Sequence, residues 1–217
     1  MKIKVFHSPD SDDVAMMLAL SSGAIPTGQY SFEFFQGDTQ ELNLMALERR
    51  GDVVAVSAAL FPALAEHYVL LEPGASVAHH NGPVVISKRF STLEELQDKT
   101  IAVMGEHTTS CLVAKKIFTQ AKFVTVPLSP RTIVFDLLND DSIDAAVIIH
   151  EGQMPEMYKG LNVVADLAVW WQSTYKLPLP LGILVARKSL GPINLSNISA
   201  LIRESIEAAI ANRLEYS

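Results

Sequence analysis

The feature that most constrains the fold of this chain is the alternation of short apolar runs with helical patterns. Several runs consist of Val, Ile and Ala without interruption, which is typical of strands that helices cover on both faces. The alternation predicts an α/β fold with a largely parallel sheet. The predicted strands are Ile3–His7, Tyr30–Phe35, Val53–Ser57, Val69–Leu71, Val84–Ser87, Ile101–Met104, Val124–Leu128, Ala145–Ile149, Val163–Leu167 and Ile183–Ala186.

Helices are expected between these strands. Asp38 and Glu41 have the spacing of a capping box, and Ser91 and Glu94 repeat that spacing. The last helix carries an apolar stripe that includes Ile198, Ile202 and Ile210, and the stripe predicts one buried face. The predicted helices are Asp13–Ser22, Thr39–Arg50, Thr109–Gln120, Arg131–Leu138 and Ser196–Leu214.

Composition narrows the class of protein. Hydrophobic residues make up 49% of the 217 residues, enough for a sizeable core. The net charge of −7 argues against a nucleic-acid partner, which requires a basic surface. A single cysteine, Cys111, excludes an internal disulfide and a multi-thiolate metal site.

No membrane segment is expected. The longest apolar run, Val53–Ala65, is interrupted by Ser57 and Pro62 and is shorter than the roughly 20 residues that a span requires. The first residues are typical of a strand rather than of a signal peptide, because polar residues follow at Ser8. We therefore expect a cytoplasmic protein with no membrane contact.

Two breaks in the strand pattern predict two lobes. A charged break follows a buried strand at Lys88–Ser91, and prolines hold the chain extended within Tyr175–Gly182. We expect residues 1–89 to begin the first lobe, residues 90–180 to form the second, and residues 181–217 to return to the first. Such an arrangement is a two-lobed clamp.

Polar residues follow the first and third predicted strands, where ligands bind in open α/β sheets. Asp10, Asp12 and Asp13 can cap a helix, accept hydrogen bonds from substrate hydroxyls or contribute to a metal site. A metal is disfavoured, because no second acidic or histidine cluster completes the shell. Ser57 ends the third strand, where it either donates to a ligand or caps the next helix.

Two further strand ends carry residues that could bind a ligand or take part in a reaction. In the segment Gly105–Ser110, Thr108 and Thr109 open a helix whose free N–H groups suit an anion, although a plain helix cap has equal weight. His150 follows an apolar strand, and a histidine there serves either as a general base or as a hydrogen-bonded structural residue. The pair Trp170 and Trp171 either lines an aromatic ligand or packs between lobes.

In these segments the sequence resembles the 1,4-dihydroxy-6-naphthoate synthase family, whose members act in the futalosine route of menaquinone biosynthesis. The family implies a type II periplasmic-binding-protein-like fold with mixed, mostly parallel sheets. In the first segment Asp10, Ser11 and Asp12 stand where the family commonly has Cys, Pro and Asn, and the C-terminal part of the chain is short for the family. The resembling stretches are Ser8–Asp13, Gly82–Val85, His107–Thr109, Val147–Glu151 and Trp170–Gly182.

The resemblance implies a lyase that converts cyclic dehypoxanthine futalosine to 1,4-dihydroxy-6-naphthoate in an interlobe cleft, with no cofactor or metal. By position, His150 matches the catalytic base, and Asp13, Ser57, Thr108 and Thr109 match residues that bind a carboxylate substrate. Chorismate dehydratase, a sister enzyme, and a non-catalytic solute-binding protein share the fold and remain alternatives. The sequence makes no prediction of oligomeric state.

Overall fold

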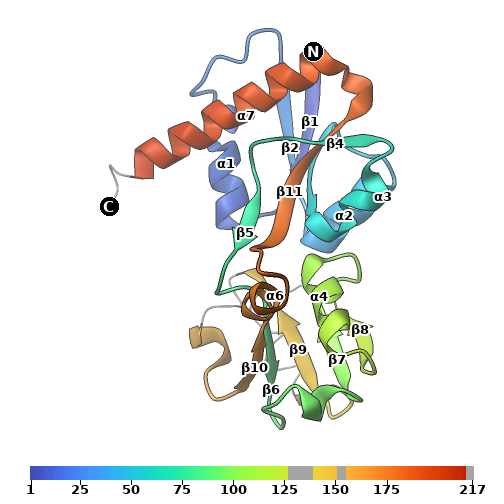
Figure 1. Ribbon diagram of the computed structural model, residues 1–217. Helices are drawn as coiled ribbons and strands as arrows, with labels where there is room; N and C mark the ends of the chain where they lie inside the picture. The colour runs from blue at the N-terminus through green and yellow to red at the C-terminus, as the bar shows by residue number, and fades with distance from the viewer. Residues whose placement is uncertain (127–138, 151–154, 214–217) are drawn as a thin grey trace. The chain divides into compact units, whose positions relative to one another are not determined.

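The computed structural model describes residues 1–126, 139–150 and 155–213. The chain divides into two units, one formed by Met1–Ser76 and Gly182–Ser217 and the other by Val77–Leu181 (Figure 1). Each unit has its own sheet and core, so each is described by itself. The predicted helix Arg131–Leu138 lies outside the described residues.

The first unit is built on a mixed sheet with the strand order β2-β1-β3-β11-β4, and β5 pairs with β11. β1 is parallel to both β2 and β3, whereas β11 is antiparallel to β3 and β4. The carboxyl ends of β1, β2 and β3 therefore share one edge. The strands are β1 (Lys2–His7), β2 (Ser31–Gln36), β3 (Val53–Ser57), β4 (Tyr68–Leu70), β5 (Ser76–Ala78) and β11 (Leu179–Arg187).

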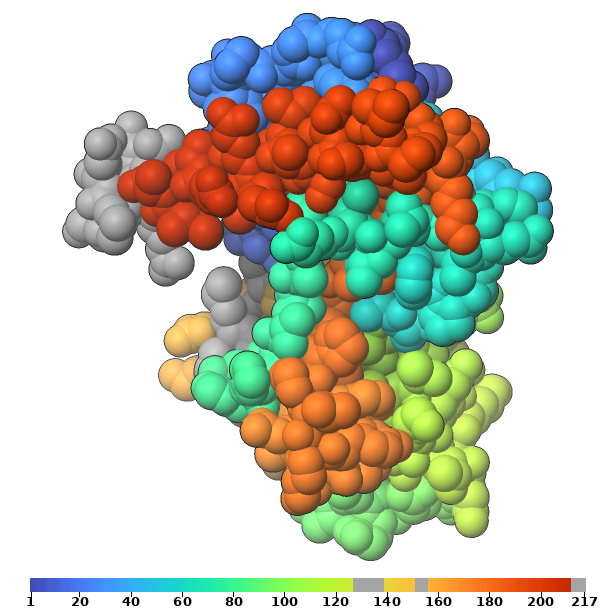
Figure 2. Space-filling model, turned by 45° about the horizontal axis from the view of Figure 1, so that its top comes forward, coloured from blue at the N-terminus to red at the C-terminus, as the bar shows by residue number. Residues whose placement is uncertain are grey.

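Helices cover both faces of this sheet. Ile3 and Val5 of β1 pack with α1 (Ser11–Ser21) and α7 (Pro192–Arg213) on one face. Phe6 of β1 and Val54 of β3 pack on the other face with α2 (Thr39–Leu47) and α3 (Phe61–Leu64). The alternation of buried side chains along β1 and β3 thus joins the sheet to two separate cores. The outer face of α7 lies along the surface of this unit (Figure 2).

The second unit contains a mixed sheet with the strand order β10-β6-β9-β7-β8. β7 is parallel to β8 and β9, and β6 is antiparallel to β9 and β10. α4 (Thr109–Ile117) and α6 (Leu167–Tyr175) supply buried residues to the core on one face. The strands are β6 (Val84–Ser87), β7 (Thr100–Val103), β8 (Lys122–Thr125), β9 (Ala145–Ile148) and β10 (Asn162–Asp166).

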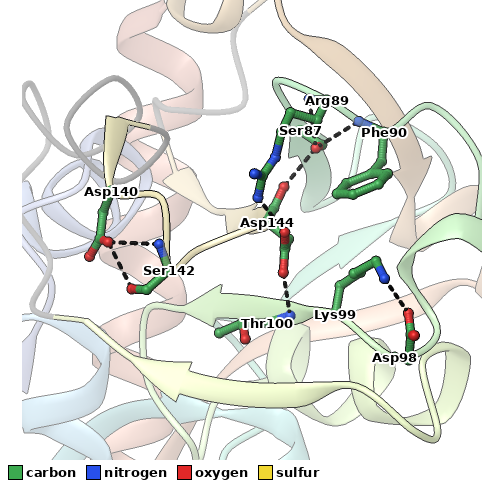
Figure 3. A network of polar contacts seen from close by, with 9 residues as sticks. All are labelled: Ser87, Arg89, Phe90, Asp98, Lys99, Thr100, Asp140, Ser142 and Asp144. Carbon is green, nitrogen blue, oxygen red and sulfur yellow. Dashed lines mark hydrogen bonds and ion pairs between the residues drawn. The ribbon is translucent and has the colours of Figure 1, made fainter.

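A polar network joins β6, β7 and β9 at the edge where β7 and β9 begin (Figure 3). Asp144, just before β9, accepts a hydrogen bond from Thr100 N at 2.9 Å and pairs with Arg89. The backbone carbonyl of Asp144 accepts a hydrogen bond from the Ser87 hydroxyl at 2.6 Å. This network lies at the edge opposite the carboxyl ends of β7 and β9. It therefore links the strands without occupying the carboxyl edge, where ligands bind in open α/β sheets.

The structure corrects three expectations. The first boundary between the units falls at Ser76 rather than after Arg89, because β6 pairs with β9 and β10 and therefore belongs to the second sheet. Antiparallel pairing is more extensive than the sequence suggested, because β6 and β11 both run against their neighbours. The capping interaction after Arg89 joins Thr92 to Glu95 and precedes only a short 3₁₀ turn, Glu94–Leu96.

Candidate functional site

The parallel strands β1 and β3 bring the first two predicted segments to one edge of the first sheet. Phe6 of β1 pairs with Val54 of β3, and both strands end shortly afterwards, at His7 and Ser57. The loop that begins at Ser8 and the hydroxyl of Ser57 therefore lie at the carboxyl edge, where ligands bind in open α/β sheets.

The acidic loop after β1 is ordered by its own hydrogen bonds. Ser8 N donates to Asp13 Oδ2 at 2.8 Å, and the Ser8 hydroxyl donates to Asp10 Oδ2 at 2.7 Å. Burial raises the pKa of the Asp13 carboxyl, the hydrogen bond from Ser8 opposes that shift, and the nearby Asp12 charge reinforces it. The Asp10 side chain does not cap α1, contrary to one interpretation of the sequence.

His7 belongs to the same edge and was missed by the sequence analysis. Its side chain is buried, and its Nδ1 lies 2.7 Å from the carbonyl oxygen of Ser8. Because a carbonyl only accepts hydrogen bonds, Nδ1 carries the proton in this contact. The signal that could have identified it is the one that marked His150, a histidine at the end of an apolar strand.

Ser57 is held by a residue that the sequence analysis also missed. Asn43, on α2, donates from Nδ2 to Ser57 Oγ at 3.0 Å and accepts from Ser57 N through Oδ1 at 2.9 Å. Both side chains are buried, and Ser57 makes no side-chain cap for the turn that follows it. The capping alternative for Ser57 is therefore wrong.

Thr108 and Thr109 open α4 in the second unit as predicted, and their hydroxyls have internal partners. Thr108 is the N-cap: its Oγ1 accepts from Cys111 N at 3.1 Å and donates to Gly105 O at 2.8 Å. Thr109 Oγ1 donates to Leu181 O at 2.9 Å. Anion binding here would therefore rely on the N–H groups and dipole of the helix N-terminus more than on the threonine hydroxyls.

His150 follows β9 at the carboxyl edge of the second sheet, the edge at which β7 leads to Gly105. Its φ is +56°, a left-handed conformation that few non-glycine residues adopt. Such conformations cost free energy and cluster at functional sites. Its side chain is half-buried.

Trp170 and Trp171 lie on α6 and pack against the core of the second unit. Their rings contact Tyr175, with centroids 6.1 and 4.4 Å from its ring centroid. Among the described residues no group of three His, Cys, Asp or Glu side chains is arranged to hold a metal ion.

Two surface hollows lie away from these residues. A hollow of about 520 Å³ in the first unit is lined by residues that include Lys4 and Phe6 of β1 and Asp52, just before β3. A hollow of about 180 Å³ in the second unit borders Asp144, before β9. Within the described ranges, no helix is long and apolar enough to cross a membrane.

Comparison with known proteins identifies relatives over nearly the whole chain. A family model described as "Menaquinone biosynthesis" matches residues 3–217. The 1,4-dihydroxy-6-naphthoate synthase of Streptomyces coelicolor is 29% identical over 214 residues, which cover 95% of this chain and 73% of that protein. The enzyme of the same name from Thermus thermophilus is 30% identical over 210 residues, covering 97% of this chain and 75% of that protein.

Solved structures confirm the fold class. Protein AF1704 from Archaeoglobus fulgidus has a TM-score of 0.89 and 36% identity, over 99% of this chain and 78% of that one. The alkanesulfonate-binding protein SsuA from Xanthomonas axonopodis pv. citri, bound to MOPS, has a TM-score of 0.66 at 10% identity, over 99% of this chain and 76% of that one. The second likeness shows the fold alone, which is the type II periplasmic-binding-protein-like fold predicted from the sequence.

Proposed function

The chain belongs to the menaquinone biosynthesis family, and we propose that it converts cyclic dehypoxanthine futalosine to 1,4-dihydroxy-6-naphthoate. The names of the two curated relatives support this activity. The observation that carries it within this chain is the strained backbone of His150 at the carboxyl edge of the second sheet. A strained residue at this edge, where ligands bind in open α/β sheets, supports a role for the His150 side chain.

In the proposed reaction His150 acts as the general base. Its neutral imidazole takes a proton from a substrate carbon, and the electron pair of that C–H bond forms a new double bond as the bond to the sugar-derived fragment breaks. The fragment leaves with the electron pair of the broken bond, and the remaining ring becomes aromatic. A positioned base of this kind contributes about 10²–10⁴-fold to the rate.

We propose substrate-binding residues for each unit by itself. The N-terminus of α4, at Thr108 and Thr109, suits the substrate carboxylate, because its N–H groups and dipole favour negative charge. In the first unit, Asp13 suits a substrate hydroxyl and Ser57 a further polar group. The ligand class is thus a small carboxylate, and we expect the reaction to occur in the cytoplasm.

Incubation of the purified protein with cyclic dehypoxanthine futalosine, followed by mass spectrometry, tests the proposed activity. We expect 1,4-dihydroxy-6-naphthoate to appear in step with loss of substrate. A parallel incubation with chorismate serves as the control for the sister reaction. Dehydration of chorismate without formation of the naphthoate would overturn the proposal, and so would tight binding of the futalosine substrate without turnover.

A further inference from the structure

Asn43 is a buried polar residue whose side-chain amide makes both of its hydrogen bonds to one residue. Its side chain has 0% exposure, although it lies on α2, where asparagine is a weak helix former. An amide buried this deeply costs free energy unless hydrogen bonds satisfy it. Both bonds go to Ser57, at the end of β3. The pairing therefore links a helix to the one hydroxyl that ends this strand.

The direction of each hydrogen bond follows from the chemistry of the atoms. The backbone N–H of Ser57 only donates, so the atom that faces it at 2.9 Å is the amide oxygen of Asn43. The amide nitrogen then faces Ser57 Oγ, at 3.0 Å, and it too only donates. Ser57 Oγ is consequently an acceptor in this contact, and its own hydrogen points away from Asn43.

Among the described residues, the one hydrogen bond found for the Ser57 hydroxyl is the bond that it accepts from Asn43. Across the sheet, Gly182 of β11 stands directly opposite Ser57. Directly opposed residues of an antiparallel pair project their side chains on the same face. A Cβ at Gly182 would have no neighbour closer than Ser76 Cβ, at 3.9 Å. The strand therefore leaves room beside Ser57 and supplies no competing side chain.

We propose that Asn43 is a positioning residue that fixes the Ser57 hydroxyl as a hydrogen-bond donor. The substrate group that meets Ser57 is then an acceptor, a carbonyl or carboxylate oxygen, rather than a group that must donate its own proton. This inference rests on the proposed function, because it states which partner donates in one hydrogen bond between the protein and that substrate. It assigns Asn43 no contact with the reacting atoms.

The Asn43→Asp variant tests the direction of the hydrogen bond between residue 43 and Ser57 Oγ. It keeps the shape of the side chain but replaces the amide donor by a carboxylate acceptor. An ionised carboxylate cannot donate to Ser57 Oγ and instead accepts the hydroxyl proton, which is then lost to the substrate. Protonation of the introduced carboxyl restores a donor. We expect KM to exceed the wild-type value by roughly tenfold or more at high pH, the effect of losing a hydrogen bond to a charged group. The ratio of the two KM values should fall as pH decreases, with kcat changing much less.

Two further variants separate positioning from a general structural effect. Ser57→Ala should raise KM by a similar factor, and adding Asn43→Asp to it should raise KM no further, since the two residues act as one unit. Asn194→Asp is the matched control: this asparagine also lies on a helix of the first unit and both donates and accepts hydrogen bonds. It should leave KM unchanged. A KM ratio for Asn43→Asp that does not vary with pH, or effects that add in the double variant, would overturn the inference.

Hydrogen exchange of the Asn43 side-chain amide, measured by NMR on asparagine-labelled protein, gives a test independent of activity. We expect slow exchange in the wild type and faster exchange in Ser57→Ala, which removes the acceptor. Equal exchange in the two proteins would contradict the inference even if Asn43→Asp fails to fold. A wild type without turnover but with this exchange difference would overturn the proposed function and retain the Asn43–Ser57 geometry.

Discussion

Asp13 illustrates at the residue scale how the burial of a carboxylate opposes stability. Burial raises the pKa of its carboxyl, so the folded state binds more protons than the unfolded state as pH rises past the ordinary value of 3.8. The contribution of Asp13 to the free energy of unfolding therefore falls across that window and stays lower at neutral pH. A buried carboxylate that lowers the free energy of unfolding in this way is expected where its charge interacts with a ligand.

Asp13→Asn should therefore raise the melting temperature at pH 7. The amide oxygen still accepts the hydrogen bond from Ser8 N, while the penalty for burying a charge disappears. The difference from wild type should vanish below about pH 3.8, where both side chains are neutral. Thermal unfolding across pH measures this, with Asp98→Asn as a surface control. A variant less stable than wild type at pH 7 would show that the carboxylate stabilises the fold.

Sequence reasoning located individual residues where a strand end or a helix start marked them, as at Ser57 and Thr108. It missed Asn43, because its partner lies 14 positions away and the pairing forms only once α2 packs on the sheet. It also left the Thr109 hydroxyl open to a ligand, since its bond to Leu181 O joins residues 72 positions apart. Contacts of this kind depend on the tertiary fold and have no local signature.

At the scale of elements, Gly82 fixes the approach of α6 to β6. A Cβ at Gly82 would lie 2.5 Å from Ala168 Cβ and 3.0 Å from Ala168 N, and Ala168 is a buried residue of the core. Gly82 N also donates to Asp166, the N-cap of α6. This close approach gives a physical reason for glycine at the start of the segment Gly82–Val85.

Gly82→Ala should lower the free energy of unfolding by about 1–3 kcal/mol, the usual cost of overpacking a core. Gly182→Ala is the matched control, because its added methyl meets nothing closer than 3.9 Å. Denaturant unfolding of both variants measures the difference. Equal stability of the two variants would mean that α6 adjusts to the added methyl group without cost.

Local signals predicted several elements well. The capping box of Asp38 and Glu41 is confirmed, and Ile198 and Ile202 of the predicted apolar stripe are fully buried. The same stripe fails at Ile210, which is 62% exposed, because the end of α7 extends past the residues that cover its beginning. Helix periodicity identifies an apolar face. How far along the helix that face is buried depends on the neighbouring elements.

At the scale of the whole molecule, the order of strands was the hardest feature to predict. Placing β6 in the first lobe was wrong, because nothing in the sequence of a fully buried strand shows which sheet it joins. Its partners, β9 and β10, follow far along the chain. Both chain ends nevertheless belong to one unit, as the second predicted crossing implies.

The fold alone does not distinguish an enzyme from a binding protein. Solute-binding proteins share the architecture at 10–18% identity, whereas the family model and the two named relatives connect this chain with biosynthesis. A histidine that acts as a base is the feature that a binding protein does not need. The decisive evidence therefore concerns the chemistry of His150.

The most direct measurement is the turnover of cyclic dehypoxanthine futalosine by His150→Asn beside the wild type. Asparagine keeps a hydrogen-bonding group and tolerates the left-handed backbone at φ +56°, so folding should survive. We predict that kcat falls by at least about 10²-fold while KM and melting temperature change little. Near-normal turnover by the folded variant would contradict the assignment of His150 as the base and with it the proposed mechanism.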